Sequence, residues 1–338
     1  MLQIEKILGK RERLAPRLPI MKPIAINASV ANVCNLKCEF CSNADKNFKH
    51  NKSFIDLKTM KSFVDNLAYH SVKLKVLTLA GTGEPLLHKD IVKMVSYISE
   101  GKITESIDII TNATLLNEQL SRELSEAGLG TLRISINGLS DEEYEKYTGR
   151  KIDYESLRNS IEYFYKHKGN TRVYIKIMSY MVNTEERRLK YESDFKNICD
   201  VLNIENVFQL SNDINYSEMV VHNGTNMKGG EQVQAEICPL PFYQCYLNAD
   251  GTISACCEAG AWHTPPMLIM GNIEKESIND IWNGEKMNKL RVSLLRNENI
   301  GICRNCSFFR NNIYKEDVLD YDCENLLEIY LGMLNNNI

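Results

Sequence analysis

The sequence lacks the features of a secreted or membrane-spanning chain. No apolar run approaches the roughly 20 residues of a transmembrane helix. Its start is basic around Lys10 to Arg13, but it contains neither the apolar stretch nor the small-residue cleavage site of a signal peptide. We therefore expect a cytoplasmic protein with no membrane partner.

An excess of charge of one sign is also missing. The 40 basic and 44 acidic residues give a net charge of -4, which provides no long-range attraction for nucleic acid. There is no repeat of solenoid period and no long low-complexity tract. A chain of 338 residues that is 43% hydrophobic is long enough to bury a sizeable core, in one large domain with an appendage or in two domains.

Strand-like and helix-like patterns alternate between residues 23 and 212. The expected strands are residues 24 to 30, 74 to 80, 107 to 111, 132 to 136, 173 to 181 and 206 to 210. Segments with helical apolar spacing lie between them, for example residues 57 to 70, 89 to 101 and 117 to 128. This alternation is typical of a parallel sheet, and six such units would make an incomplete barrel. Catalytic groups in such sheets sit at the carboxyl ends of the strands.

The chain is rich in cysteine, with eleven in all. In a reducing compartment, thiols are more often metal ligands or catalytic groups than disulfide partners. Cys34, Cys38 and Cys41 fall within "CNLKCEFC", directly after the first expected strand. Three thiolates on one tight loop suit an iron-sulfur cubane whose fourth iron stays open. A structural zinc site, which more often has four ligands, and plain buried thiols are the alternatives.

The C-x3-C-x2-C loop, with Phe40 before its last cysteine, resembles the signature loop of radical S-adenosylmethionine (SAM) enzymes. One β/α unit later, "AGTGEPLL" resembles the Gly-Gly-Glu-Pro segment of that family, with Thr82 in place of the first glycine. The resemblance implies that Thr82, Gly83 and Glu84 contact the amino group of SAM, which a backbone carbonyl beside a carboxylate suits.

The same resemblance assigns further SAM contacts after the third and fourth strands. Asn112 in "TNATLL", Ser135 in "SINGLS" and Arg150 occupy places where the family makes polar contacts to the SAM ribose and carboxylate. The open iron would bind SAM, and one electron from a donor such as flavodoxin or ferredoxin would release a 5'-deoxyadenosyl radical. The work of the protein is then binding, orientation and exclusion of side reactions.

A second set of cysteines follows in the last third of the chain, in the order Cys238, Cys256, Cys303 and Cys306. The first two form Cys-x12-Gly-x4-Cys around "NADG", a good β-turn between two short strands. By spacing alone these four could also hold zinc. The segment resembles the SPASM or shorter twitch extension of radical SAM enzymes, which carries auxiliary iron-sulfur clusters. Asn312 and Glu316 occupy later SPASM cysteine positions, so we expect one auxiliary [4Fe-4S] cluster.

Cys257 and Glu258 directly follow an expected cluster ligand. Because side chains alternate along a strand, Cys257 would face away from the cluster if Cys256 faces it. Its thiol could then donate a hydrogen atom to a substrate radical, with Glu258 as a base. The alternative is that Cys257 packs as a small hydrophobe. Cys199 has the spacing of a core thiol, and Cys245 and Cys323 stay unassigned.

Together these features predict an α/β fold, a partial (βα)6 TIM-like barrel with a small C-terminal SPASM/twitch iron-sulfur domain. The expected divisions are an N-terminal extension (1–22), the barrel (23–212), a linker or active-site loop (213–237), the auxiliary cluster domain (238–323) and a tail (324–338).

The resemblance implies hydrogen abstraction from carbon, for oxidation or epimerisation. Only some 22 residues precede the first expected strand, too few for the peptide-recognition domain of many peptide-modifying relatives. We therefore expect a small-molecule substrate of sugar, aminocyclitol or nucleotide-sugar type. The alternatives are a peptide-modifying maturase acting on a short peptide and, in another class, a non-catalytic iron-sulfur or zinc protein that binds a partner.

Overall fold

Parallel strands and helices alternate through the barrel region, as the sequence predicts. The computed structural model describes residues 11–45, 47, 53–209, 213–219, 224–256, 265–304 and 306–335. The barrel strands are β1 (Ala25–Ser29), β2 (Val76–Ala80), β3 (Ile107–Thr111), β4 (Thr131–Ile136), β5 (Arg172–Met178) and β6 (Val201–Glu205). The helices among them are α2 (Leu57–Tyr69), α3 (Ile91–Gly101), α4 (Glu118–Glu126), α5 (Asp141–Thr148), α6 (Tyr154–His167) and α7 (Glu185–Phe195).

The C-terminal region extends the same sheet. Its strands are β7 (Gln244–Leu247), β8 (Thr252–Ser254) and β9 (Ile269–Asn272), and its helices are α9 (Ile278–Asn283), α10 (Glu285–Leu295), α11 (Ser307–Asn312) and α12 (Cys323–Asn335). Short 3-10 turns are η1 (Ala15–Arg17), η2 (Ser42–Ala44), η3 (Pro85–Leu87), η4 (Ser179–Val182), η5 (Leu240–Phe242), η6 (Pro266–Leu268), η7 (Gly301–Cys303), η8 (Lys315–Asp317) and η9 (Asp320–Asp322).

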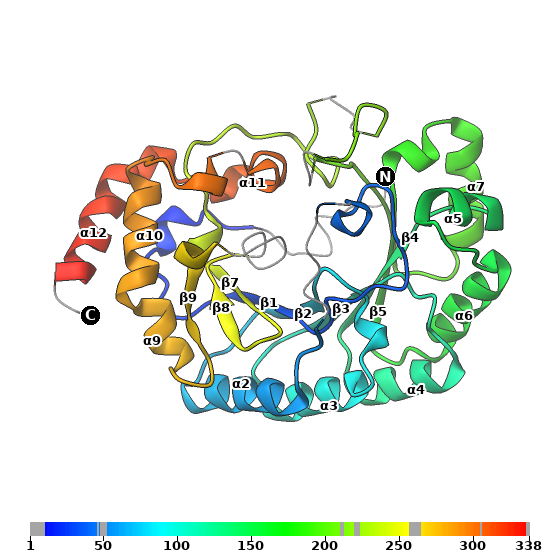
Figure 1. Cartoon of the computed structure of the whole chain (residues 1–338), viewed down its shortest axis with the longest axis horizontal. Coiled ribbons are helices and arrows are strands. Elements are labelled where there is room, and N and C mark those ends of the chain that lie inside the picture. Colours follow the sequence, from blue (N-terminus) through cyan, green and yellow to red (C-terminus); the bar gives the residue numbers. More distant parts are fainter. Residues whose placement is uncertain are drawn as a thin grey trace.

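The described strands form one sheet in the order β6-β5-β4-β3-β2-β1-β7-β8-β9. Strands β1 to β6 pair in parallel, β7 pairs in parallel with β1, and β8 and β9 continue antiparallel. In Figure 1 the sheet is curved, with α2, α3, α4 and α6 along its outer face and α9, α10 and α12 beside β9. This is the mixed α/β, partial TIM-like architecture that the sequence predicts.

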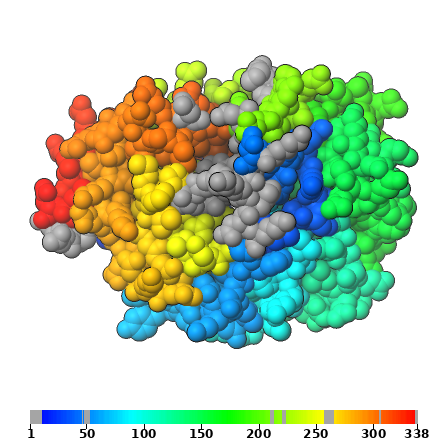
Figure 2. All heavy atoms as spheres, in the orientation of Figure 1, coloured from blue at the N-terminus to red at the C-terminus, as the bar shows by residue number. Residues whose placement is uncertain are grey.

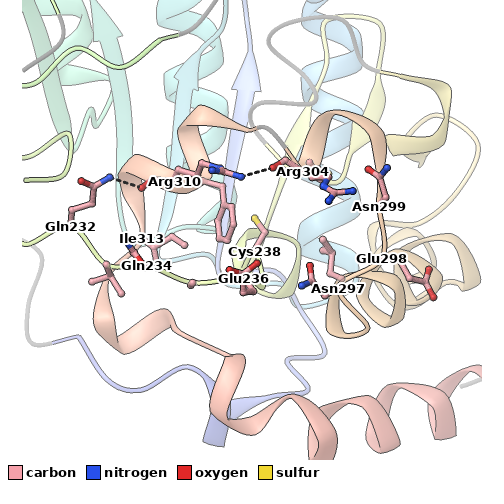
Figure 3. Close-up of a pocket in the computed structure, with 15 residues that line it drawn as sticks. Gln232, Gln234, Glu236, Cys238, Asn297, Glu298, Asn299, Arg304, Arg310 and Ile313 are labelled. Atoms are coloured by element: carbon pink, nitrogen blue, oxygen red, sulfur yellow. Dashed lines mark hydrogen bonds between the residues drawn. The ribbon is translucent and has the colours of Figure 1, made fainter. Parts of the chain in front are cut away.

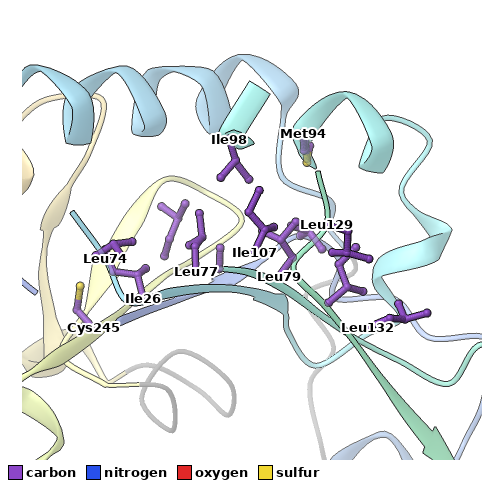
Figure 4. Packing of buried hydrophobic residues seen from close by; sticks show 14 of the residues in the cluster. Ile26, Leu74, Leu77, Leu79, Met94, Ile98, Ile107, Leu129, Leu132 and Cys245 are labelled. Carbon is purple, nitrogen blue, oxygen red and sulfur yellow. The ribbon is translucent and has the colours of Figure 1, made fainter. Parts of the chain in front are cut away.

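Apolar side chains on the convex face of the sheet form the main core. Ile26, Leu77 and Ile109, on three neighbouring strands, are each 0% exposed. Figure 4 shows such residues filling the space between the sheet and the helices. Because side chains alternate along a strand, the residues between them face the concave side. Cys245 on β7 belongs to this core and is also 0% exposed.

One expected strand lies elsewhere in the structure. We predicted residues 206 to 210, but β6 spans Val201–Glu205, so that prediction is wrong. Glu205 ends this strand at 3% exposure, and its Oε2 accepts a hydrogen bond of 2.7 Å from Lys176 Nζ. In the local sequence an acidic residue such as Glu205 is more typical of a loop than of a strand. Its partner Lys176 lies on the neighbouring strand β5, and such a tertiary contact cannot be read from the local pattern.

The two halves of the chain pack closely against each other. Thr59 Oγ1 on α2 donates to Glu274 Oε1 at 2.8 Å, and Ile278 N donates to Asn66 Oδ1 at 2.9 Å. Figure 2 shows the yellow and orange C-terminal segments directly against blue atoms of the barrel region below them. Within the described ranges, no helix combines the length and the apolar character needed to cross a membrane.

The segment expected as a linker, residues 213 to 237, ties β6 to the C-terminal helices. Asn206 N donates to Met227 O at 2.7 Å, directly after β6. Met227 N in turn donates to Asn311 O of α11 at 3.0 Å. Where the structure describes it, this segment therefore bridges the open edge of the barrel.

Candidate active site

The first cysteine loop follows β1 and is fixed against the end of α5. Lys37 N donates to Thr148 O at 3.0 Å, and Glu39 N donates to Tyr147 O at 2.9 Å. Within the loop, Cys41 N donates to Cys38 O at 2.9 Å. These backbone bonds determine the path of the chain between the three cysteines.

Burial makes two thiols of this loop, those of Cys34 and Cys38, difficult to ionise by themselves. The pKa of Cys34 is raised to about 11, chiefly by burial and also by the nearby Glu84 carboxylate and Cys41 thiol, while a hydrogen bond from Leu36 N acts in the opposite direction. Burial raises the pKa of Cys38 well above its usual range, with contributions from Cys41 and Cys34. A cationic metal centre would reverse this, because coordinated thiols lose their protons.

Glu84 lies at the end of β2 and is enclosed by the protein. Its side chain is 2% exposed. Oε1 accepts hydrogen bonds from Leu86 N at 2.9 Å and Thr111 Oγ1 at 2.6 Å, and Oε2 accepts one from Asn112 N at 2.7 Å. Burial raises its pKa, while these three donors act in the opposite direction. The carboxylate therefore joins the ends of β2 and β3 within the protein.

Gly83 lies where no side chain fits. A Cβ there would be 2.3 Å from Val33 O and 2.5 Å from Ala31 O, both backbone atoms of the segment that leads into the cysteine loop. Beside it, Thr82 O accepts a hydrogen bond of 2.6 Å from Asn43 Nδ2, which lies just after that loop. The Thr82–Gly83 segment and the cysteine loop are thus in direct contact.

Asn112 also contacts the cysteine loop, whereas Ser135 and Arg150 lie farther along the barrel. Asn112 Nδ2 donates to Asn35 Oδ1 at 3.0 Å and lies 3.9 Å from Cys34 Sγ. Ser135 is half-buried on the concave side of β4. Arg150 is exposed, just past the end of α5.

The second cysteine set also comes together in the structure. Burial raises the pKa of Cys238 well above its usual range, and Cys256, Cys306 and Cys303 each raise it further. The hydrogen bond from Leu240 N to Cys238 acts in the opposite direction. The other three thiols thus lie near Cys238, and four thiols suit an iron-sulfur cluster in number and chemistry.

The sheet places the two cysteine sets at opposite ends of β1. The first set follows Ser29, where β1 ends. At the start of β1, Ile24 N donates a hydrogen bond to Tyr243 O, and Cys238 lies five residues before Tyr243 in the chain. Cys256 follows β8, which runs antiparallel to β7, and so it lies at the same end as Cys238.

Where the chain is described, no three His, Cys, Asp or Glu side chains converge closely enough to hold a metal ion. We therefore assign both sets by proximity and chemistry and not by a closed coordination geometry. Two further thiols stand apart from them. Burial raises the pKa of Cys245 and that of Cys199 to about 12 each, and both side chains lie in the core.

A cavity of about 550 Å³ adjoins the second set (Figure 3). Cys238 and Cys303 line it together with polar side chains. Gln232 Nε2 donates to Arg310 O at 3.3 Å, and Arg310 Nη2 donates to Arg304 O at 3.0 Å, so the hydrogen bonds drawn in Figure 3 fix part of its rim. The second cysteine set therefore borders space that is open to polar groups.

The predicted catalytic residues Cys257 and Glu258 lie outside the described residues. The expectation that Cys257 faces away from Cys256 assumed a strand through both residues. Strand β8 ends at Ser254, so strand alternation does not reach either of them. Their roles stay predictions.

The concave side of the sheet carries charged residues that the sequence did not single out. Arg133 Nη2 lies 2.6 Å from Asp108 Oδ2. Lys176 Nζ lies 2.7 Å from Glu205 Oε2, and Tyr174 OH donates to Glu205 Oε1 at 3.2 Å. The available signal was the polar residue at every second position of residues 131 to 136 and 172 to 178.

The charge of Glu205 is maintained by its surroundings. Burial alone would raise the pKa of its carboxyl, but the Lys176 ammonium, the nearby Lys228 and the Tyr174 hydroxyl outweigh burial and hold the pKa below its usual range. The concave side therefore presents ionised groups in a largely buried setting.

Comparison with known families agrees with this arrangement. The family model for the radical SAM superfamily matches residues 28–191, and the model for an iron-sulfur cluster-binding domain, SPASM, matches residues 238–307. The chain belongs to the radical SAM superfamily. As a radical SAM enzyme with a SPASM domain, it uses a [4Fe-4S] cluster, SAM and an auxiliary iron-sulfur cluster.

Individual relatives of this radical SAM enzyme are more distant. A probable GTP 3',8-cyclase of Methanococcus maripaludis is 33% identical over 135 residues, which are 40% of this chain and 43% of the relative. The aligned stretch is thus less than half of that relative's length.

Two solved structures share the fold. BtrN in complex with AdoMet and 2-DOIA is 18% identical, with a TM-score of 0.53 over 84% of this chain and 88% of its own. SuiB of Streptococcus suis bound to S-adenosylmethionine is 15% identical, with a TM-score of 0.60 over 80% of this chain and 68% of its own. At these identities the likeness concerns the fold alone.

Proposed function

We propose that this enzyme abstracts a hydrogen atom from a carbon of a polar small molecule, of sugar or aminocyclitol type, and completes an oxidation or an epimerisation. The observation that carries the proposal is the charged concave side of the sheet, where ion pairs join β3 to β4 and β5 to β6 in a largely buried setting. Hydroxyl-rich and amino-bearing substrates suit such a surface because the free-energy cost of removing a polar group from water is smaller when the group finds a hydrogen-bond or charge partner.

The residues that would hold the cofactors follow from the two sets. The SAM-binding [4Fe-4S] cluster would be held by Cys34, Cys38 and Cys41, and the auxiliary cluster by Cys238, Cys256, Cys303 and Cys306. When bound, these groups supply one-electron cleavage of SAM and a one-electron acceptor, with a carrier such as flavodoxin or ferredoxin as donor.

Around the first cluster the protein orients SAM. The Thr82–Gly83 backbone, in contact with the cysteine loop, would receive the SAM amino group. Glu84 is a positioning residue in this proposal, because its carboxylate is occupied by three donors of the protein itself. Ser135 and Arg150 stay proposed contacts to the ribose and carboxylate.

Around the substrate, the half-buried cations provide recognition. Lys176 uses one bond of its ammonium group on Glu205, and a lysine ammonium has three donors. Arg133 pairs with Asp108 through Nε and Nη2, which leaves other donors of its guanidinium for a ligand. These side chains would orient hydroxyl or anionic groups of the substrate.

The second half of the reaction distinguishes the two outcomes. In oxidation the substrate carbon loses a hydrogen atom, its hydroxyl loses a proton to a base, for which we propose Glu258, and one electron leaves to the acceptor, so that a carbonyl forms. In epimerisation the substrate radical instead takes a hydrogen atom from the Cys257 thiol on the opposite face. The resulting thiyl radical then needs one electron and one proton to restore the enzyme.

A product assay in deuterated water tests the proposal with the wild-type enzyme and Cys257→Ala. Candidate sugars, aminocyclitols, GTP and short peptides are incubated anaerobically with reconstituted enzyme, SAM and dithionite, and consumption of each is followed with 5'-deoxyadenosine release. Oxidation predicts a carbonyl product without solvent deuterium in both proteins. Epimerisation predicts deuterium in the wild-type product and loss of turnover in the variant. Turnover of GTP or a peptide alone would contradict the substrate class.

A further inference from the structure

Arg291 on α10 is a fully buried cation with no anionic partner in the described part of the chain. It is 1% exposed. Nε donates to Pro241 O at 3.0 Å, and Nη1 donates to Trp282 O at 2.9 Å and to Asn288 Oδ1 at 2.8 Å. Nη2 is buried without a hydrogen-bond partner. The acceptors are thus neutral groups, and the two N–H donors of Nη2 are left over.

A buried cation is unfavourable unless its surroundings compensate the charge. Here two aromatic faces contribute, since the guanidinium carbon lies 4.3 Å from the Trp282 ring centroid and 5.6 Å from that of Tyr330. Burial lowers the pKa of Arg291 to about 10, so the group keeps its charge at neutral pH. The ionisable groups that act on Arg291 are the Tyr330 hydroxyl and the Cys245 thiol, and burial raises the pKa of both, so neither supplies a full negative charge at neutral pH.

The contacts of Arg291 lead to the second cysteine set. Pro241 belongs to η5, the turn that follows Cys238 and packs through Phe242 against Tyr330 at 5.4 Å between ring centroids. The N–H of Leu240, in the same turn, donates to Cys238. Arg291 therefore secures the turn whose backbone holds the sulfur of an expected cluster ligand.

We propose that Arg291 is a positioning and charge-compensating residue for the auxiliary cluster, and this rests on the proposed assignment of the second cysteine set. A cluster held by four thiolates carries net negative charge, which is the anion that the buried guanidinium lacks. Hydrogen bonds and charge around a cluster set its reduction potential, and a nearby cation favours the more negative, reduced state. Loss of Arg291 therefore makes the auxiliary cluster harder to reduce and its loop less fixed.

The test compares Arg291→Gln and Arg291→Lys with Arg296→Gln. Arg296 directly follows α10 and is 46% exposed, so it controls for loss of an arginine at the same helix. After anaerobic reconstitution, three quantities are measured for each protein: iron per chain, the redox titration of each cluster by electron paramagnetic resonance, and 5'-deoxyadenosine formed without substrate. The 5'-deoxyadenosine yield reports on the activity of the first cluster in the same protein sample.

Arg291→Gln should lose up to about half of the bound iron, since one of two cubanes is affected. Any auxiliary cluster that remains should have a lower midpoint potential and an altered spectrum, while 5'-deoxyadenosine formation stays within about twofold of wild type. Arg291→Lys should restore part of the potential because it keeps the charge, and Arg296→Gln should match wild type.

Two results would overturn the inference. One is a folded Arg291→Gln protein whose auxiliary potential and spectrum equal those of wild type. The other is equal loss of both clusters in Arg291→Gln and Arg291→Lys, which indicates a general folding defect. A wild-type protein that never binds a second cluster would instead refute the proposed function, and it is recognised before any variant is made.

Discussion

Gly83→Ala is expected to damage SAM cleavage although it adds a single methyl group. The new Cβ would lie 2.3 Å from Val33 O, and it must reach at least 3.0 Å, so that carbonyl has to move by 0.7 Å or more. Val33 immediately precedes Cys34, and its carbonyl also accepts the backbone N–H of Glu84 at 2.9 Å. The displacement is therefore transmitted to both the cysteine loop and the segment proposed to bind SAM.

The magnitude follows from two general effects. Inserting a methyl group where backbone atoms already touch lowers the free energy of unfolding by about 1–3 kcal/mol. A misplacement of about 1 Å at reacting groups lowers rates by roughly 100-fold. We thus expect a folded protein that binds its iron and forms 5'-deoxyadenosine about 100 times more slowly than wild type.

The assay is 5'-deoxyadenosine release after dithionite reduction, normalised to iron, alongside thermal unfolding. Gly332→Ala is the matched control. Gly332 lies within α12, and a Cβ there meets nothing within 4 Å, so alanine should leave the rate unchanged and stabilise the helix by up to about 1 kcal/mol. If Gly83→Ala cleaved SAM at the wild-type rate, the close contact between the Thr82–Gly83 segment and the cysteine loop would not be needed for SAM cleavage, which would refute this reasoning.

Other predictions concern single side chains. Cys238→Ser should lose about half of the iron, whereas Cys245→Ala should keep all of it and lose about 1 kcal/mol of stability; equal iron contents would refute the assignment of the second set. Asn112→Ala should lower the iron content and spectral homogeneity of the first cluster, because its amide holds the cysteine loop, and unchanged spectra would count against that role. Glu205→Gln should lose about 3 kcal/mol at pH 7, because Lys176 is left buried without its counter-charge. The pKa of Glu205 is depressed in the folded state, so its contribution to stability is fully present above the usual glutamate pKa near 4.3 and is lost as pH falls through the folded-state pKa. Chemical denaturation at both pH values measures the effect of Glu205→Gln. An equal loss of stability at pH 7 and below the folded-state pKa would contradict this.

Much of the barrel follows from local pattern. Residues 107 to 111 were expected as a strand and form β3 with those bounds, because the run is β-branched and ends in a polar turn. Residues 173 to 181 were expected as one strand, and β5 instead ends at Met178 before the turn η4. Local propensity identifies such elements well but places their ends less accurately.

What the sequence could not supply are the tertiary partners. Glu84 fits a family motif, yet its burial against Thr111 and Asn112 depends on the pairing of β2 with β3. Arg291 looks like an ordinary helix residue until the fold surrounds it with Trp282 and Tyr330. Long-range contacts of this kind have no short-range signature, so charges buried by the fold were missed.

In the proposed function, two iron-sulfur clusters cooperate in one radical SAM enzyme. Anaerobic reconstitution with iron and sulfide counting, followed by dithionite reduction with SAM, tests it most directly. We expect about eight irons per chain, two distinct cluster spectra and formation of 5'-deoxyadenosine. A protein that carries its full iron but releases no 5'-deoxyadenosine would contradict it.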